Sequence, residues 1–555
     1  MNNFFIQSPP VLGDTYRDDS FLRGYLQRKL PPQMLLAVEP DLQELGRICG
    51  GELYGLQLSD RLHEPELTQW DGWGNRIDRI DVTPLWKRAA EIAARSGLIA
   101  IPYERAHGRY SRIRQFAAVH LFHPSSDVYT CPLAMTDGAA RTLFVAQNEA
   151  LMARALPRLI SRDPLQAWTS GQWMTESTGG SDVGASLTRA VQEQGVWRLY
   201  GKKWFTSAIT ADMALTLARP EGNGPGGGGL AMFYVETRDS SGAANGIRVE
   251  RLKDKLGTRK VPTAELTLEG ARAELVSEAR NGTRHIEPML VVTRTWNSVT
   301  SVAFMRRGLM LARSYAKQRR AFGAQLDQLP LHVDTLAGLE AETRGAFLLA
   351  FELVELMGRL EAGEIDDQQR ALLRLITPIA KLLTAKQAVS VVSECIEAFG
   401  GAGYVEDTGL PTLLRDTQVL PIWEGTTNVL SLDVVLRGDL ARGLPALRTR
   451  VEQCVESARD PRLRAAGAKA LAAVDHAGQS LRQQGDAIQI QSNARRLAMT
   501  LGRALELALL VEHGQWELDA LRRQSGVAAG VRFAASPIDL LAEVDPEDSA
   551  QLLRE

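Results

Sequence analysis

The chain has 555 residues, enough for about three or four domains at roughly 150 residues each. Hydrophobic residues make up 45% of the chain and charged residues 23%, which are ordinary values for a globular protein with a large buried core. The formal charge of -2 excludes proteins whose overall task is electrostatic capture of nucleic acid or of a membrane surface, although a local basic patch can hide inside a balanced total.

The cysteines and the apolar segments predict a soluble cytoplasmic protein. Cys49, Cys131, Cys395 and Cys454 lie far apart and form no CxxC pair, so we expect reduced thiols and neither a disulfide framework nor a metal site. Met1–Pro10 lacks the basic and apolar regions of a secretory signal. No uncharged apolar run reaches the length of about 18 residues that a membrane-spanning helix needs, so we expect no membrane insertion.

Residues 1–170 are predicted to form an N-terminal arm and a helical domain. Prolines at positions 9, 10, 31 and 32 interrupt residues 1–40, which predicts an extended arm followed by irregular structure. From Asp41 to about Arg162 the apolar residues recur at helical spacing, as in Leu85, Ala89 and Ile92. That period predicts helices.

Residues 171–282 are predicted to form a small β domain. Period-two alternation bounded by Gly and Pro predicts strands at Trp197–Phe205, Met213–Ala218, Leu230–Glu236 and Ala264–Leu268. The tract Gly224–Gly229 has no Lys-Ser or Lys-Thr pair after it and no helix behind it. It is therefore predicted to be a flexible hairpin loop rather than a phosphate-binding loop.

Residues 283–440 return to helical spacing. Amphipathic patterns from Ile286 onward, over Leu331–Gly363 and over Gln368–Phe399, predict four antiparallel helices with short connections, ending near Arg437. Residues 441–555 are rich in Ala, Leu and Arg and predict an additional helical domain.

One carboxylate stands in a setting suited to proton transfer. Glu424 follows the bulky Trp423 and precedes a small Gly-Thr-Thr turn. Apolar surroundings disfavour the charged form of a carboxylate, which suits a group that takes and returns a proton near neutral pH. Glu424 is therefore a candidate general base, and the alternative is an ordinary acidic residue at a helix start, where the macrodipole favours it.

Two motifs of the β domain could surround a planar ring. The segment Met174–Asp182 is rich in glycine and small hydroxyl residues, so its backbone N–H groups can approach an anion or a ring carbonyl. The alternative is a capped loop before a helix. On a strand, Trp204 and Thr206 point to the same face, where an indole could cover a ring and a hydroxyl could bond its edge. The alternative is ordinary packing in a β core.

Two motifs of the helical part could contact a pyrophosphate. Arg319 lies in the sequence RRAFG at the end of a long predicted helix and offers a bidentate fork. Gly400 and Gly401 would let the backbone approach a ligand closely. Helix termination at Gly323 and at Gly400-Gly401 is the alternative for these motifs.

In this order, MTESTGGSDVG, KKWFTS, RRAFG, AFGGAGYVED and IWEGTTN resemble the motifs of the acyl-CoA dehydrogenase family. The QSPP start, the segment from Gly72 to Trp86, Trp423 and the added C-terminal helices make the chain most similar to the AidB-like, alkylation-response branch. The resemblance implies an α+β, mostly α fold with an N-terminal helical domain, a middle β-barrel domain, a C-terminal four-helix bundle and an extra C-terminal helical segment. It also implies a homotetramer with FAD bound where subunits meet.

The resemblance also implies a role for each matching residue. Glu424 would take the α proton of an acyl-CoA thioester while the β hydride passes to flavin N5, and an unidentified electron acceptor would then reoxidise the flavin. Thr293 matches the position of an alternative base in some family members, so no rival carboxylate is expected. The residues that would contact FAD are Met174, Thr175, Ser181, Trp204, Thr206, Arg319, Phe322, Gly400, Gly401, Trp423, Thr426 and Asn428.

Two other functions are compatible with the same motifs. The AidB-like branch includes DNA-binding members that limit alkylation damage, and DNA binding needs a positive surface. Basic and acidic residues are equal in number in residues 441–555, yet Arg442, Arg448, Arg450, Arg459, Arg462, Arg464, Arg495 and Arg496 could share a face. Solvated helix faces with ion pairs are the alternative. A protein that sequesters acyl-CoA or fatty acid with little turnover would also keep these residues, and kinetics separate it from a dehydrogenase.

Overall fold

A computed structural model of the chain describes residues 7–239, 241–483 and 487–554. The chain folds as two compact units. Unit 1 comprises Met1–Gln43, His107–His120 and Asn297–Glu555, and unit 2 comprises Glu44–Ala106 and Leu121–Trp296. These units cut across the four predicted segments, because part of the N-terminal region groups with the C-terminal helices. The four-segment division remains a prediction.

The N-terminal region is helical where the proline pattern predicts irregular structure, so that prediction is wrong from residue 20 onward. Helix α1 (Ser20–Lys29) begins at Asp19, whose carboxylate accepts hydrogen bonds from the backbone of Phe21 and Leu22 at 3.1 and 3.0 Å. Helix α2 (Pro32–Ile48) begins at a proline, whose missing N–H costs nothing at a first helical position. Residues 1–6 of the predicted arm lie outside the described residues, and residues 7–19 form no helix or strand.

Unit 2 contains the helices that the spacing after Asp41 predicts. They are α3 (Tyr54–Ser59), α4 (Pro84–Arg95), α5 (Ala100–Glu104), α7 (Thr130–Ala146) and α8 (Glu149–Leu159). The short α9 (Gly282–His285) follows the β strands and lies outside that prediction. A hairpin of β1 (Glu66–Trp70) and β2 (Arg76–Asp81) interrupts them and was not predicted. Asp71 holds its turn by accepting hydrogen bonds from the backbone of Trp73 and Asn75, both at 2.8 Å.

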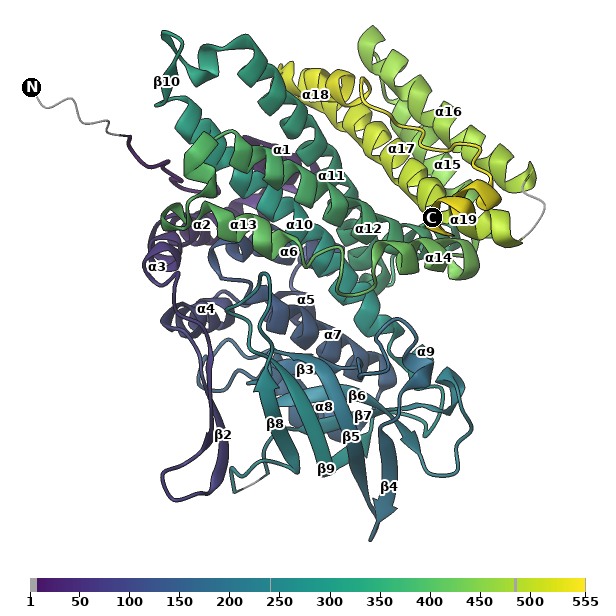
Figure 1. Ribbon diagram of the computed structural model, residues 1–555. Helices are drawn as coiled ribbons and strands as arrows, with labels where there is room; N and C mark the ends of the chain where they lie inside the picture. The colour runs from purple at the N-terminus through teal and green to yellow at the C-terminus, as the bar shows by residue number, and fades with distance from the viewer. Residues whose placement is uncertain (1–6, 240, 484–486, 555) are drawn as a thin grey trace, which may run out of the picture. The chain divides into compact units, whose positions relative to one another are not determined.

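The β strands of unit 2 close into a barrel (Figure 1). They are β3 (Ser170–Trp173), β4 (Arg189–Glu193), β5 (Val196–Ser207), β6 (Met213–Pro220), β7 (Ala231–Glu236), β8 (Ile247–Leu252) and β9 (Thr263–Leu275). Neighbouring strands run β6-β4-β5-β9-β7 and return to β6, while β3 pairs with β6 and β8 with β9. The four predicted strands are confirmed within β5, β6, β7 and β9, and β3, β4 and β8 were missed. Gly224–Gly229 joins the antiparallel β6 and β7, which confirms a hairpin loop.

Unit 1 contains the predicted bundle and the predicted extra helices. The bundle helices are α10 (Glu287–Ala316), α11 (Pro330–Ala362), α12 (Asp367–Glu397), the short α13 (Leu410–Thr417) and α14 (Thr427–Arg437). The C-terminal extension consists of α15 (Leu440–Glu456), α16 (Pro461–Gln483), α17 (Ala487–Leu521), α18 (Ser525–Phe533) and α19 (Pro546–Arg554). Helix α6 (Ser111–Phe122) precedes them in the chain. The predicted end of the bundle at Arg437 is confirmed.

The cysteines and one long apolar helix bear on the expectations from composition. All four cysteines are buried and free, as predicted. Within the part of the chain that the structure describes, α12 is long and apolar enough to cross a membrane by length and composition, but 83% of its apolar window is buried inside the protein. That burial is typical of a core helix. The described ranges contain no group of three or more His, Cys, Asp or Glu side chains that could hold a metal ion.

Candidate functional site

Four candidate residues of unit 2 lie together where a loop meets the barrel. The backbone N–H of Trp204, on β5, donates to the carbonyl oxygen of Thr175 at 3.0 Å. This bond fixes the loop that begins at Met174, a buried residue, against the strand that carries Trp204 and Thr206. The fifth candidate, Ser181, belongs to an exposed stretch of the same loop. The loop therefore presents glycine and hydroxyl groups to solvent beside a half-buried indole.

A bulge in β5 separates the two candidate residues of this strand. Lys203 pairs with Leu266 on β9 and Thr206 pairs with Ala264, so β5 has one extra residue between the two pairs. Trp204 and Thr206 therefore do not follow the simple alternation of a regular strand, which is the basis of their predicted shared face. Thr206 is buried, and its hydroxyl donates to the Ala264 carbonyl at 2.6 Å. A hydroxyl has one hydrogen to donate. While the Thr206 hydroxyl donates to Ala264, it can therefore only accept a hydrogen bond from a ligand.

A cation covers one face of the Trp204 indole. Lys253 Nζ lies 3.5 Å from the ring centroid, and an ion pair of 2.6 Å with Glu265 holds the ammonium there. A cation and a planar ligand cannot share one face of a ring, so the opposite face of Trp204 is the one that could stack on a ligand. The sequence motifs did not identify Lys253, because its contact with Trp204 depends on strand pairing.

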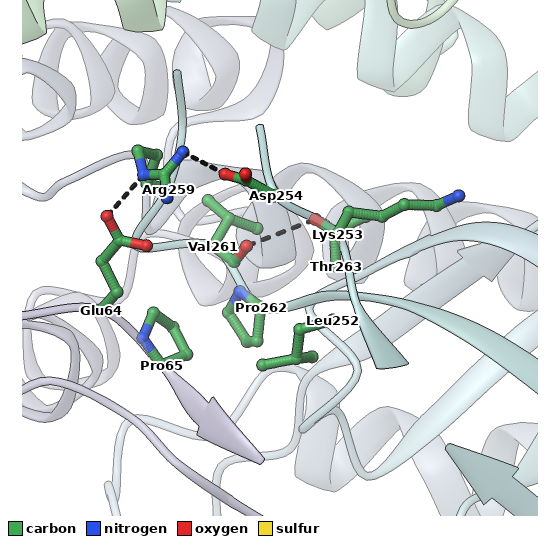
Figure 2. Close-up of a pocket in the computed structure, with 9 residues that line it drawn as sticks. All are labelled: Glu64, Pro65, Leu252, Lys253, Asp254, Arg259, Val261, Pro262 and Thr263. Carbon is green, nitrogen blue, oxygen red and sulfur yellow. Dashed lines mark hydrogen bonds and ion pairs between the residues drawn. The ribbon is translucent and has the colours of Figure 1, made fainter. Parts of the chain in front are cut away.

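A cavity of about 200 Å³ lies beside Lys253 in unit 2 (Figure 2). Apolar side chains of Pro65, Leu252, Val261 and Pro262 contribute to its lining. Arg259 forms an ion pair with Glu64 and another with Asp254 at 2.6 Å along its rim. These charges therefore satisfy one another, and the cavity offers no unmatched charge for recognition of an ionic ligand.

A buried ion pair between Lys203 and Glu176 holds the Met174–Asp182 loop against the barrel. The sequence motifs did not predict this pair. Lys203 Nζ lies 2.8 Å from Glu176 Oε1, with side chains 0% and 3% exposed. The ammonium also donates to the Leu217 carbonyl at 2.8 Å, and the carboxylate accepts from the Thr188 hydroxyl at 2.6 Å. Burial alone raises the pKa of Glu176, but the Lys203 ammonium overrides this effect and holds that pKa below its usual value.

In unit 1, Arg319 and Phe322 lie in a tight hairpin after α10. Strands β10 (Arg320–Ala321) and β11 (Ala324–Gln325) pair around Phe322 and Gly323, which have φ values of 51° and 84°. The turn leaves the Phe322 side chain 97% exposed. Gly323 is therefore a hairpin glycine and not a helix cap.

The two candidate glycines of unit 1 follow α12 and have open surroundings. Gly400 has a φ of 59°, and no atom lies within 4 Å of the position that a side chain would take at Gly400 or Gly401. This open backbone permits the close approach of a ligand. The Tyr315 ring packs on Phe399 with centroids 4.8 Å apart, and the Tyr315 carbonyl accepts from the Arg319 N–H at 2.9 Å. These contacts bring the RRAFG motif and the glycine motif together.

Glu424 lies in a left-handed turn just before α14. Its φ is 56° and that of Gly425 is 101°, and a side chain on Gly425 would come within 2.8 Å of Leu430. The helix begins at Thr427 with Thr426 as its N-cap, so Glu424 stands outside the first turn. The alternative of a helix-start glutamate favoured by the macrodipole is therefore not supported.

Thr293, which matches the position of the alternative base, is buried, and its hydroxyl donates a hydrogen bond to the Met289 carbonyl oxygen at 3.1 Å.

The residues around Glu424 present an unused donor. The Nε1 atom of Trp423 is buried and has no hydrogen-bond partner within the described residues. A buried donor without an acceptor is costly, so a ligand oxygen or nitrogen at this point would satisfy it. Asn428 is exposed, and its side-chain oxygen accepts from Arg495 of α17 at 3.4 Å.

These features fit a flavin nucleotide. The open Gly400-Gly401 backbone and the exposed loop of unit 2 can approach phosphates, the free face of Trp204 can stack on a ring, and the Trp423 indole can donate a hydrogen bond. Each unit carries its own part of the predicted residue set. Three lysines contact predicted residues or their neighbours. Lys203 of the KKWFTS motif pairs with Glu176, whereas Lys253, over the Trp204 ring, and Lys381, bonded to the Gly425 carbonyl, lie outside the motifs.

Comparisons with known proteins cover nearly the whole chain. Residues 7–163 match the adaptive response protein AidB N-terminal domain, 171–271 the acyl-CoA dehydrogenase middle domain, 280–438 the acyl-CoA dehydrogenase C-terminal domain and 443–550 the acyl-CoA dehydrogenase 11 C-terminal domain-like family. Acyl-CoA dehydrogenase family member 11 of Caenorhabditis elegans is 44% identical over 551 residues, which are 95% of this chain and 88% of that protein.

One further relative has a similar sequence, and a crystal structure has a similar fold. The putative acyl-CoA dehydrogenase AidB of Escherichia coli is 33% identical over 402 residues, which are 71% of this chain and 70% of that protein. The crystal structure of Caenorhabditis elegans ACDH-11 in complex with C11-CoA aligns with a TM-score of 0.95 at 43% identity. That alignment covers 100% of this chain and 96% of the other. The fold that the sequence motifs implied is thereby confirmed.

Proposed function

This chain belongs to the acyl-CoA dehydrogenase family, in its AidB-like branch, and from that premise we propose that it is an FAD-dependent acyl-CoA dehydrogenase. The observation that carries the proposal is the geometry of Glu424, which stands outside the helix that follows it, in a strained turn beside an unsatisfied indole donor. Non-glycine residues in left-handed conformations concentrate at functional sites, where surrounding contacts hold them in place.

FAD is the cofactor that this proposal requires. Met174, Thr175, Ser181, Trp204 and Thr206 of unit 2 would contact it, with Trp204 using the face that Lys253 leaves open. In unit 1 the contacts would come from Arg319, Phe322, Gly400, Gly401, Trp423, Thr426 and Asn428. Because Phe322 is almost fully exposed, it suits contact with the FAD of a neighbouring subunit, as in the homotetramer that the motifs imply.

The reaction we propose is the α,β-dehydrogenation of an acyl-CoA thioester. The Glu424 carboxylate takes the proton from the α carbon and becomes a carboxylic acid, while the backbone N–H of Glu424 donates to the thioester carbonyl and stabilises its developing charge. Bound FAD supplies the acceptor for the hydride that leaves the β carbon. The product is a trans-2-enoyl thioester, and a separate electron acceptor in the cytoplasm takes up the electrons.

The DNA-binding alternative receives less support from the side-chain contacts of the C-terminal extension. Arg448 pairs with Asp475 at 2.8 Å, Arg462 pairs with Asp460 at 3.0 Å, and Arg459 pairs with Asp519. Each of these arginines has an acidic neighbour, so the positive charge on this surface is locally balanced, whereas DNA binding needs a net positive surface. A salt-dependent titration with duplex DNA tests this alternative directly, and measurable salt-sensitive affinity would restore it.

The decisive experiment is anaerobic mixing of the purified holoprotein with acyl-CoAs of different length and branching, followed by flavin absorbance. We expect rapid bleaching with one substrate class. Glu424→Gln should retain FAD but slow the limiting rate by about 100- to 10,000-fold, the usual contribution of a general base. Glu394→Gln, an exposed glutamate on α12, should behave as the wild type.

Two results would contradict the proposal. Absence of bleaching with every acyl-CoA, despite full FAD occupancy, would favour a sequestering or DNA-associated protein. Native rates in Glu424→Gln would show that another group takes the proton.

A further inference from the structure

A buried lysine holds the turn that contains Glu424. Lys381 lies within α12, and its side chain is fully buried. Its Nζ donates to the carbonyl oxygen of Gly425 at 2.7 Å. This carbonyl belongs to the residue directly after the candidate base, so the lysine fixes the backbone on which the Glu424 side chain is carried.

Burial of the Lys381 ammonium among apolar side chains carries a desolvation cost that packing alone does not offset. The α12 residues around it, including Leu382, Leu383 and Ala385, are buried and apolar. An ammonium group loses its hydration when it enters such a helix core, whereas a leucine or methionine would fill the same space without that penalty. The hydrogen bond to Gly425 is a contribution that an apolar residue could not make.

The turn itself needs such a restraint. Glu424 and Gly425 adopt left-handed conformations in succession, and a strained backbone persists only where surrounding contacts determine it. Thr426 caps α14 on one side of the turn, although its contact with the Val429 N–H is long at 3.5 Å. On the other side, Asn297 donates to the Leu420 carbonyl at 3.2 Å. The Lys381 bond is the shortest of these three contacts and the nearest to Glu424.

We propose that Lys381 is a positioning residue for the candidate base: its hydrogen bond to Gly425 holds the left-handed turn so that the Glu424 carboxylate is aimed at the α proton. The proposal rests on the proposed function. Lys381 acts through the backbone of the turn and is not itself assigned a contact with substrate or cofactor. Misplacing a reacting group by about 1 Å can cost on the order of 100-fold in rate.

The test compares Lys381→Met, which removes the donor, with Lys381→Gln, which retains an N–H donor, in the full-length holoprotein. Lys386→Met, an exposed lysine on the same helix, is the matched control. We expect Lys381→Met to lower the limiting rate of flavin reduction by about 100-fold, with the half-saturating acyl-CoA concentration unchanged within about twofold. Lys381→Gln should recover part of that loss. Both variants should retain FAD.

Deuterium exchange of the backbone around Glu424 gives a readout that does not depend on turnover. We expect faster exchange of residues 424–426 in Lys381→Met than in the wild type or Lys386→Met. If the wild type reduces no flavin with any acyl-CoA, the proposed function fails, and exchange alone then judges the role of Lys381. Native exchange, a native rate per bound FAD in Lys381→Met, or failure of both Lys381 variants to fold would overturn the inference.

Discussion

Lys203 and Glu176 show how a single buried ion pair can hold a loop of the proposed FAD site. Removing one partner of a buried ion pair leaves an uncompensated charge and destabilises a protein by about 3–5 kcal/mol. We expect Lys203→Met to lower the unfolding midpoint and to weaken FAD retention, since Glu176 belongs to the loop that carries Met174 and Thr175.

Two controls define this prediction for Lys203. Lys202→Met changes the exposed neighbouring lysine and should leave the midpoint unchanged. Adding Glu176→Gln to Lys203→Met removes the unpaired charge, so the double variant should be more stable than Lys203→Met alone. Equal midpoints for Lys203→Met and the wild type would contradict the pair's contribution.

Asp127 makes the stability of the folded protein depend on pH. Burial raises the pKa of Asp127 to about 6, although Gln57 and Lys260 oppose the rise and Asp60 adds to it. A carboxyl whose folded pKa lies above its unfolded value of 3.8 binds protons more tightly in the fold, so its ionisation destabilises the protein above about pH 6. That penalty disappears as pH falls from about 6 toward about 4.

Asp127→Asn should therefore raise the unfolding midpoint at about pH 8 and lose this advantage at about pH 4, because the wild-type carboxyl is then neutral as well. The asparagine oxygen can still accept the Gln57 hydrogen bond, which is 2.7 Å long in the native protein. Thermal unfolding of both proteins across this range measures the effect. A difference that does not vary with pH would contradict the assignment.

Between elements, buried charges join the C-terminal extension to the bundle within unit 1. Arg450 of α15 forms ion pairs with Glu352 of α11 at 2.6 Å and with Glu512 of α17 at 3.1 Å. Arg28 of α1 reaches the same Glu512 at 3.0 Å. Burial raises the pKa of Glu512, but the arginines, Arg450 first, outweigh that effect and lower it to about 2.

Arg450→Met should destabilise unit 1 by about 3–5 kcal/mol, because it removes the ion-pair partner of the buried Glu352 carboxylate and leaves Glu512 with Arg28 alone. The lowered pKa of Glu512 means that its contribution to stability is present above about pH 4.5 and is lost as pH falls toward about 2. The variant and the wild type should therefore converge in stability at low pH. Arg448→Met is the control, since that arginine is 45% exposed and surface pairs contribute little.

The elements that sequence reasoning found are those with long regular patterns. Helical spacing over α11 and α12 and alternation over β5 and β9 were sufficient, because each pattern repeats many times. The strands β3 and β4 are too short for alternation to stand out. The proline pattern does not predict helix α1, because Pro9, Pro10, Pro31 and Pro32 lie close to it in the sequence, although Asp19 stands at its N-cap position.

The candidate site was predictable only as far as its motifs are local in sequence. Lys381 is 44 positions from Gly425, and Lys203 is 27 positions from Glu176, so no spacing rule connects them. The bulge in β5 depends on pairing with β9 and overrides the alternation that placed Trp204 beside Thr206. Family motifs name the residues that face a ligand, whereas the groups that hold those residues depend on tertiary packing.

At the scale of the whole molecule, two exposed aromatic side chains suit the proposed assembly of several copies. Phe322 is 97% exposed and Tyr404 is 91% exposed, and they belong to the RRAFG and AFGGAGYVED motifs, in which the family resemblance places FAD contacts where subunits meet. Large exposed apolar groups commonly mark interaction surfaces. We therefore expect that assembly and cofactor retention depend on the same residues.

Phe322→Glu tests this coupling. A carboxylate at the centre of a subunit contact must be desolvated without a partner, so the variant should have a smaller assembly mass than the wild type in light scattering and should lose FAD on dilution. Its unfolding midpoint in the absence of FAD should stay close to that of the dissociated wild type, because Phe322 is almost entirely exposed within the chain. Trp73→Ser is the matched control, since Trp73 is 92% exposed at the tip of the β1–β2 hairpin, outside the predicted site. If Trp73→Ser reduces the mass while Phe322→Glu does not, the subunit contact lies elsewhere and the assignment of Phe322 to a neighbouring cofactor is wrong.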